Sequence, residues 1–282
     1  MSPRRFAVIG DPVGHSKSPA MQGAAFRALG LPHTYEAIRA RSDDLPRIVA
    51  MLRDGAYDGL NVTVPHKERV LPLVDALDAS ARVAGAANTL VRGADGRIVA
   101  HNTDAPALAA ELERLAGPAP WRAGFGALVL GSGGVSRAAI TALGVTLGLK
   151  DIAVRARAFD DRARSDAFAA NAPCHVTPQP WCASAKSEGR MLAIVQATSA
   201  GMRGGDPGDA VAAVVAWDAL PSDCVAIDVV YSPRDTPWLR AARARGLRSD
   251  DGLGMLARQG ALALELWLGV EAPLDAMRAA LE

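Results

Sequence analysis

The sequence predicts an α/β protein with two domains. Patterns typical of strands and helices alternate along the chain, and a break rich in glycine and proline over 117–126 precedes a restart of the same alternation. The segments 191–198 (MLAIVQAT) and 224–230 (CVAIDVV) are nearly continuous apolar runs, which suit parallel strands covered on both faces. A chain of 282 residues is long enough for two domains that each bury a core.

The first elements follow from short periodic segments. We expect a strand over 6–10 (FAVIG), a helix over 20–29, a second strand over 33–38 (HTYEAI) and a second helix over 43–54. The loop DPVGHSKSP joins the first strand to the first helix.

The segment NVTVPHK (61–67) begins in a predicted third strand over 59–65 and ends two residues beyond it. Its apolar and polar residues alternate, which predicts a half-buried strand, and Pro65 should end the ladder because proline has no N–H. A polar, helix-like run, HKERV, follows, with helical segments to about residue 83. Asn61, Thr63 and Lys67 could therefore meet in one pocket at the carboxyl end of the strand. The alternative is an edge strand with a solvated lysine.

A hairpin and a helix complete the first half. ANTLVRG (87–93) and GRIVAHN (96–102) are expected to pair through a turn at 94–96. Asp104 is expected to cap a helix that runs to Leu115, with Pro106 in its tolerant first turn.

The second half begins with a strand, a glycine loop and a helix. GSGGVSRA (131–138) follows the strand GALVL and opens the predicted helix 135–148. In such a loop the first glycine allows a tight turn, the second lets the backbone approach a pyrophosphate, and the helix N-terminus attracts its charge. Ser136 takes the third small position. The alternative is a glycine turn that binds no ligand.

The next strand, DIAVRAR (151–157), should end near an adenosine ribose. Alternation places Arg155 and Arg157 on one side of it, where an arginine suits the 2′-phosphate of NADP. Asp160 and Asp161 follow and leave NAD open, and Arg157 could instead be a solvated surface residue. The tail, 252–269, has helical periodicity and closes with Gly269.

Composition narrows the function class. Half of the residues are hydrophobic, 22% are charged and the net charge is +1, so nothing indicates a nucleic-acid or acidic-membrane partner. Cys174, Cys182 and Cys224 form no CxxC, which favours a reduced, cytoplasmic compartment, and no ligand spacing supports a metal. We expect no signal peptide, and the apolar segment 261–270 is too short to span a bilayer.

Further polar residues are scattered along the chain at predicted loops and element ends. Taken singly, each could be a helix cap or core filler. As a set they are mostly neutral hydrogen-bonding groups, which suit a small polyhydroxylated ligand. They are Ser16, Ser18, Asn88, Asp104, Tyr231, Gly252, Met255 and Gln259.

In order along nearly the whole chain, the combination of motifs resembles the shikimate dehydrogenase family. The motifs are HSKSP, NVTVPHK, AANTL, NTD, GSGGVSRA, ATSAGM, YSPRDTPWL and DGLGMLARQG. The resemblance implies a substrate-binding catalytic domain over 1–104 and 253–282, and a Rossmann-like dinucleotide-binding domain over 105–252. It also implies reversible, NADP-dependent reduction of 3-dehydroshikimate to shikimate in aromatic amino-acid biosynthesis.

By the same resemblance, Lys67 matches the catalytic lysine and Asp104 its partner. A lysine ammonium can protonate the ketone oxygen as hydride reaches the ketone carbon. Ser16 and Ser18 would bind the substrate carboxylate, with Tyr231 close to it. Asn61, Thr63, Asn88, Asp104 and Gln259 would bind the ring hydroxyls or the carbonyl.

The resemblance also implies which residues hold the dinucleotide, with Thr198, Gly252 and Met255 near its nicotinamide end. The full set is Gly131, Ser132, Gly133, Gly134, Val135, Arg137, Arg157, Thr198, Val229, Gly252 and Met255.

Several positions depart from the family pattern. Ala156 and Ala158 flank Arg157 where polar partners of the 2′-phosphate are usual, so NAD use stays open. Gln196 replaces an asparagine, and alanines follow the NTD where glycines are common. The paired serines favour shikimate over quinate. The alternatives are a quinate or shikimate-analogue dehydrogenase and, less favoured, a non-catalytic shikimate sensor; a monomer and a homodimer are both open.

Overall fold

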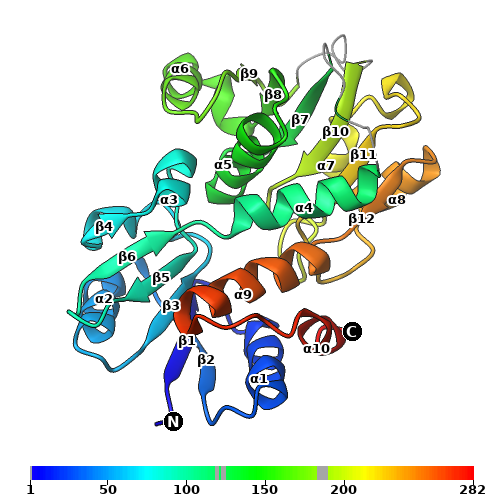
Figure 1. Ribbon diagram of the computed structural model, residues 1–282. Helices are drawn as coiled ribbons and strands as arrows, with labels where there is room; N and C mark the ends of the chain where they lie inside the picture. Colours follow the sequence, from blue (N-terminus) through cyan, green and yellow to red (C-terminus); the bar gives the residue numbers. More distant parts are fainter. Residues whose placement is uncertain (1, 118–120, 122–124, 183–189) are drawn as a thin grey trace. The chain divides into compact units, whose positions relative to one another are not determined.

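The structure is a computed structural model that describes residues 2–117, 121, 125–182 and 190–282. The chain divides into two compact units (Figure 1). Unit 1 joins Met1–Ala107 to Leu256–Glu282, and unit 2 is Leu108–Met255. Each unit contains a six-stranded sheet with helices packed on it. The predicted α/β class with two domains is confirmed.

The sheet of unit 1 has the order β2-β1-β3-β5-β6-β4. The strands β1, β2 and β3 are parallel, whereas β5 is antiparallel to both β3 and β6, and β4 is parallel to β6. The carboxyl ends of β1, β3 and β6 therefore share one edge with the amino end of β5. The strands are β1 (Arg5–Gly10), β2 (Thr34–Arg39), β3 (Gly59–Val62), β4 (Ala76–Leu77), β5 (Thr89–Arg92) and β6 (Ile98–His101).

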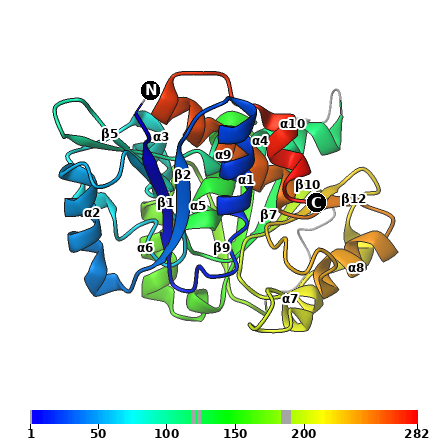
Figure 2. The ribbon, with the colours of Figure 1, turned by 90° about the horizontal axis from the view of Figure 1, so that it is seen from below.

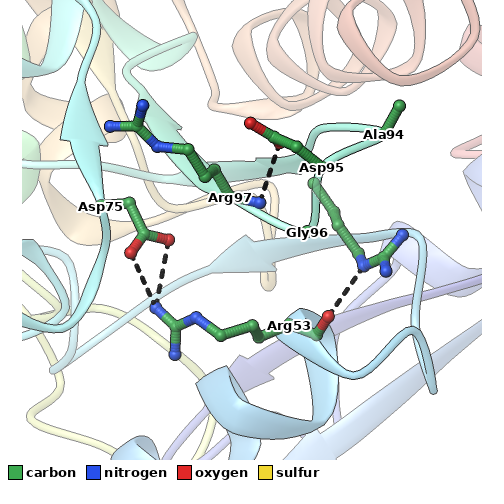
Figure 3. Close-up of a pocket in the computed structure, with 7 residues that line it drawn as sticks. Arg53, Asp75, Ala94, Asp95, Gly96 and Arg97 are labelled. Atoms are coloured by element: carbon green, nitrogen blue, oxygen red, sulfur yellow. Dashed lines mark hydrogen bonds and ion pairs between the residues drawn. The ribbon is translucent and has the colours of Figure 1, made fainter.

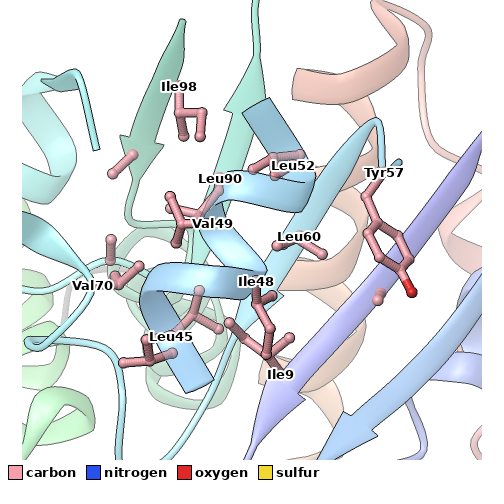
Figure 4. Close-up of a cluster of buried hydrophobic side chains, with 14 of the residues drawn as sticks. Ile9, Leu45, Ile48, Val49, Leu52, Tyr57, Leu60, Val70, Leu90 and Ile98 are labelled. Atoms are coloured by element: carbon pink, nitrogen blue, oxygen red, sulfur yellow. The ribbon is translucent and has the colours of Figure 1, made fainter. Parts of the chain in front are cut away.

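One face of this sheet packs on α2 (Leu45–Arg53). The apolar residues of α2 recur at positions 45, 48, 49 and 52, which places them on one helix face. They lie against Ile9, Leu60 and Leu90 of the sheet (Figure 4).

The other face packs on aromatic residues and on α9 (Leu253–Leu268). The indole of Trp267 stacks on Phe6 with ring centroids 4.8 Å apart, and its Nε1 donates to the Leu90 carbonyl at 3.0 Å. A Cβ on Gly59 would lie 2.3 Å from Trp267 Nε1, so only glycine fits beneath this indole.

The remaining helices of unit 1 are α1 (Ser18–Ala28), α3 (Ala79–Ala84) and α10 (Leu274–Ala279), with 3₁₀ turns at Ser42–Asp44 and Leu71–Leu73. The helices α1 and α10 lie side by side (Figure 2), and Lys17 Nζ donates to the Leu281 carbonyl. The helix α4 (Asp104–Ala116) begins in unit 1 and continues into unit 2.

The sheet of unit 2 is fully parallel, in the order β12-β11-β10-β7-β8-β9. The chain runs outward from β7 through β8 and β9, then returns to β10 on the other side of β7. This reversal is a topological switch point, where open α/β sheets bind ligands at the carboxyl ends of their strands. The strands are β7 (Gly126–Leu130), β8 (Asp151–Arg155), β9 (Thr177–Gln179), β10 (Met191–Gln196), β11 (Val225–Asp228) and β12 (Arg248–Asp250).

The helices of unit 2 are α5 (Gly134–Ile140), α6 (Arg162–Ala170), α7 (Asp209–Ala213) and α8 (Pro237–Ala244). Helix α5 continues as a π-helix over Thr141–Thr146, and 3₁₀ turns lie at Arg157–Asp160 and Trp217–Ala219.

Two details of the third strand are wrong in the sequence prediction. The strand β3 ends at Val62 rather than at Pro65, and all of its residues are buried because α2 packs on one face of the sheet and Trp267 on the other. Val64 lies beyond the strand and is 49% exposed. The run HKERV forms turns instead of a helix. The predicted 117–126 break lies partly outside the described residues.

Candidate active site

Lys67 and Asp104 form a buried ion pair in unit 1. Lys67 Nζ lies 2.7 Å from Asp104 Oδ2, and the two side chains are only 9% and 5% exposed. A charged pair that is this well buried needs close mutual contact to offset its loss of hydration. The solvated-lysine alternative is therefore wrong.

Hydrogen bonds at His66 and at Lys67 hold the backbone of this turn in place. The buried His66 ring contacts the Ala40 carbonyl through Nε2 at 2.7 Å, and the Lys67 carbonyl accepts from the Ala87 N–H at 2.8 Å. These contacts hold the turn to the end of β2 and to the loop before β5, so the Lys67 side chain has a defined origin.

Asp104 was expected to cap α4, and that prediction is wrong. Asp104 is the first residue of α4 and its carboxylate contacts Lys67. The Oδ1 atom of Asn102 accepts from the Ala105 N–H at 3.0 Å, so Asn102 supplies the cap.

A network of neutral amides and hydroxyls lies in the same unit, centred on Asn88. Asn88 Nδ2 donates to Thr103 Oγ1 at 2.9 Å and to Gln259 Oε1 at 3.2 Å. Asn88 Oδ1 accepts from the Thr103 N–H at 2.7 Å, and Thr103 Oγ1 donates to the Gln259 carbonyl at 3.0 Å. The network thus brings together two predicted residues, Asn88 and Gln259, that are 171 positions apart in the sequence.

Asn61 joins this network through β3. Its Nδ2 donates to the Asn88 carbonyl and to Thr89 Oγ1, both at 3.0 Å, and its Oδ1 accepts from the Tyr35 hydroxyl at 2.7 Å. Sequence reasoning missed Tyr35, Thr89 and Thr103. Thr89 and Thr103 belong to the quoted motifs AANTL and NTD, which could have indicated them.

The other predicted substrate residues lie near the carboxyl ends of β1 and β3. Ser16 Oγ accepts from the Ser18 N–H at 3.2 Å, and Ser18 begins α1. Thr63 directly follows β3, and a Cβ on Gly10 would lie 2.4 Å from its methyl group, so glycine at the end of β1 gives Thr63 its room.

The glycine loop of unit 2 connects β7 to α5, at the switch point. Gly131 has φ +116°, which a residue with a side chain rarely adopts, and a Cβ there would lie 3.1 Å from the Ala197 carbonyl and from the Thr198 methyl group. Gly133 precedes α5 with open space where a Cβ would be. Ser132, Gly134 and Val135 complete the turn.

Three arginines of unit 2 that the sequence analysis named have different surroundings. The prediction that Arg155 shares a strand face with Arg157 is wrong, because β8 ends at Arg155. Arg155 is fully buried and donates to the Val214 carbonyl and to Gln179 Oε1. Arg157 lies in the following turn with its side chain 76% exposed, 3.9 Å from Asp206 Oδ2. Arg137 Nη1 donates to the Asn171 carbonyl at 3.2 Å, beyond the end of α6.

The remaining predicted residues of unit 2 follow β11 and β12. A Cβ on Gly252 would lie 2.2 Å from the Val229 carbonyl oxygen, so these two predicted residues are in direct contact and glycine is required. Tyr231 follows β11 by three residues and Met255 lies in the first turn of α9.

A carboxylate that sequence reasoning did not single out lies at the end of β11. Asp228 is fully buried, and its oxygens accept from Thr236 Oγ1 at 2.6 Å and from the Val230 N–H at 2.9 Å. Burial raises the pKa of Asp228 to about 7. Asp228 therefore fixes both ends of the loop that carries Tyr231.

A surface pocket of about 380 Å³ lies at the turn of the β5–β6 hairpin. Arg53 pairs with Asp75 there at 3.1 Å, Arg92 Nε donates to the Arg53 carbonyl, and Asp95 accepts from the Arg97 N–H (Figure 3). The residues known to line it include none of the predicted site residues. We therefore assign it no function.

Among the residues that the structure describes, no three His, Cys, Asp or Glu side chains gather closely enough to hold a metal ion. No helix within those ranges is long and apolar enough to cross a membrane.

Comparisons with known proteins identify relatives of this chain. The model of the shikimate dehydrogenase substrate binding domain matches residues 8–90, and that of the shikimate 5'-dehydrogenase C-terminal domain matches residues 252–282. A shikimate dehydrogenase (NADP(+)) from Methylobacterium radiotolerans is 41% identical over 269 residues, which cover 95% of this chain and 92% of that protein.

Two solved structures have similar folds. Shikimate 5-dehydrogenase from Thermus thermophilus, in complex with NADP(H) and shikimate, aligns with a TM-score of 0.82 and 36% identity over 99% of this chain and 98% of that one. The ligand-free 5-ketofructose reductase of Gluconobacter sp. strain CHM43 aligns with a TM-score of 0.82 and 27% identity over 100% and 98% of the two chains. By identity and coverage to its relatives, this chain belongs to the shikimate dehydrogenase family.

Proposed function

We propose that this chain catalyses the reversible, NADP-dependent reduction of 3-dehydroshikimate to shikimate. The observation that carries the proposal is the buried ion pair of Lys67 and Asp104, 2.7 Å apart in the same unit as a network of neutral hydrogen-bonding groups. Such a set offers one proton donor and several hydroxyl ligands, which is what a polyhydroxylated ketone requires.

The proposed acid–base step uses the Lys67 ammonium. As the ketone carbon is reduced, its oxygen gains negative charge, and Lys67 donates a proton to that oxygen. Asp104 keeps the ammonium oriented through its hydrogen bond and balances the positive charge. In the reverse direction Lys67 accepts the hydroxyl proton. A nicotinamide cofactor, when bound, supplies or accepts the hydride.

We propose that the remaining polar residues of unit 1 hold the substrate. Ser16 and Ser18 lie in the loop and helix start after β1, where two hydroxyls can bind a carboxylate. Asn61, Thr63, Asn88, Asp104 and Gln259 would contact the ring hydroxyls or the carbonyl. Both Nδ2 hydrogens of Asn61 are donated to other groups of the protein, and Tyr35 uses one lone pair of Oδ1. The second Oδ1 lone pair can accept a hydrogen bond from a substrate hydroxyl.

The described residues of unit 2 fit a dinucleotide. The open space at Gly133 lets a pyrophosphate approach the backbone before α5, and the exposed Arg157 guanidinium can reach a 2′-phosphate. The residues that would hold it are Gly131, Ser132, Gly133, Gly134, Val135, Arg137, Arg157, Thr198, Val229, Gly252 and Met255.

We assign roles to the units on this basis. Unit 1 would bind the substrate and carry the acid–base pair, and unit 2 would bind the dinucleotide.

Cys174, Cys182 and Cys224 are present as thiols, which is consistent with a reduced, cytoplasmic compartment.

The proposal is tested by separating turnover from binding. Lys67→Ala should lower kcat by about 10²- to 10⁴-fold, the usual contribution of a general acid, while the Kd for shikimate changes by less than about tenfold. Lys150→Ala is the matched control, since Lys150 is exposed in unit 2. Near-normal turnover in Lys67→Ala would contradict the mechanism. Shikimate binding without turnover in the unaltered protein would favour a sensor.

A further inference from the structure

The Tyr35 hydroxyl lies between two residues proposed to bind the substrate. It donates to Asn61 Oδ1 at 2.7 Å, and the Ser18 side chain hydrogen-bonds the same hydroxyl. Tyr35 is on β2 and Asn61 on β3, and β1 lies between these strands. The phenol therefore crosses one strand to reach the amide, and it links β2 with β3 and with the start of α1.

The hydrogen bonds of Asn61 leave its side chain few alternatives. Both Nδ2 hydrogens are already donated, to the Asn88 carbonyl and to Thr89 Oγ1. The Tyr35 hydroxyl uses one lone pair of Oδ1, so a single acceptor site remains. A rotated amide would set Oδ1 against the Asn88 carbonyl, which is unfavourable. The Asn61 side chain is therefore held in one orientation, as a hydroxyl acceptor.

The phenol is suited to act as a permanent donor. Burial raises the pKa of Tyr35 above its ordinary value, so the hydroxyl keeps its proton wherever the protein is folded near neutral pH. Because that proton is directed to Asn61, the phenol oxygen can only accept from Ser18. A ligand carboxylate that draws the Ser18 hydroxyl away leaves the Tyr35–Asn61 bond in place.

We propose that Tyr35 is a positioning residue for the substrate, which orients Asn61 toward a ring hydroxyl and Ser18 toward the carboxylate. The inference rests on the proposed function, because it explains how two residues that would bind the substrate, Asn61 and Ser18, are held. Tyr35 itself makes no chemical step.

The test compares Tyr35→Phe with Tyr57→Phe. Tyr57 is also packed in unit 1, but its hydroxyl donates to Glu36 at 2.9 Å, and Glu36 is exposed. Tyr35→Phe should raise the KM and the calorimetric Kd for shikimate by about 5- to 30-fold, with kcat and the KM for NADP changed less than about threefold. A loss of binding that leaves kcat intact separates positioning from general damage. Tyr57→Phe should leave all four values unchanged.

A double-mutant cycle extends the test to Ser18. If Tyr35 acts partly through Ser18, the KM of Tyr35→Phe/Ser18→Ala should rise by less than the product of the two single effects. An unchanged KM in folded Tyr35→Phe, or an equal change in Tyr57→Phe, would overturn this inference while the proposed function stands. If the unaltered protein neither binds nor oxidises shikimate, the proposed function fails first.

Discussion

The buried pair of Lys67 and Asp104 should be strongly coupled in stability. Coulomb's law with an effective dielectric constant of about 20 gives roughly 6 kcal/mol of attraction at 2.7 Å. Desolvation of two side chains that are 9% and 5% exposed offsets part of this attraction. We therefore expect a coupling free energy of about 2–4 kcal/mol from the cycle of Lys67→Met, Asp104→Asn and the double variant.

Each single variant leaves one buried charge without its partner, whereas the double variant leaves none, so the double should be less destabilised than the sum of the singles. The chain has two units, so global unfolding is not a suitable readout. Denaturant-dependent hydrogen exchange of peptides from β3 and β5 reports the opening free energy of unit 1 itself.

The pair Arg39–Asp11 provides the matched control. It has the same 2.7 Å separation in the same unit, but the Arg39 side chain is 70% exposed. The cycle of Arg39→Met and Asp11→Asn should give a coupling of only about 0.2–1 kcal/mol. Equal coupling in both cycles, or additive effects of Lys67→Met and Asp104→Asn, would refute the reasoning from burial.

Three further predictions concern packing, pH and the cofactor. Gly59→Ala should destabilise unit 1 by about 1–3 kcal/mol, because the new Cβ would lie 2.3 Å from Trp267 Nε1. Gly14→Ala is the control: no atom lies within 4 Å of its Cβ position, so hydrogen exchange should show an unchanged opening free energy. The pKa of Asp228 is raised from 3.8 to about 7, so between these pH values the folded state holds a proton that the unfolded state has lost. The stability that this proton contributes should therefore fall as the pH rises from about 4 to about 7. Asp228→Asn should flatten that part of the thermal stability curve, and an unchanged slope would contradict the assignment. Arg157→Ala should raise the KM for NADP by about tenfold and leave the KM for NAD unchanged, and equal effects on both would exclude a contact with the 2′-phosphate.

Much of the fold follows from local pattern. The alternation in β5 and β6 and the turn between them could be predicted because a hairpin pairs neighbouring segments. The exact end of β3 could not, because it depends on β1 and β5 on either side. Arg155 and Arg157 differ for the same reason: the end of β8 depends on its pairing with β7 and β9, and the partners of Arg155 come from residues 179 and 214.

The candidate site shows a similar division. Lys67 and Asp104 stand out through the family motifs NVTVPHK and NTD, although either residue taken alone could be a solvated lysine or a helix cap. Tyr35 does not stand out, since a tyrosine in a strand is ordinary, and only the order of β2, β1 and β3 brings its hydroxyl to Asn61. Thr103 lies in the motif NTD, but its place in the network is seen only in its bonds to Asn88 and Gln259.

The most direct test of the central claim is nicotinamide reduction by the purified protein, with shikimate and quinate each offered with NADP and NAD. The account predicts reduction with shikimate and NADP, and a kcat/KM for this pair well above those of the other three. Comparable or greater activity with quinate or with NAD would identify a specialised relative and would fit the alanines beside Arg157. No reduction with either acid, under conditions where the folded protein binds NADP, would contradict the claim.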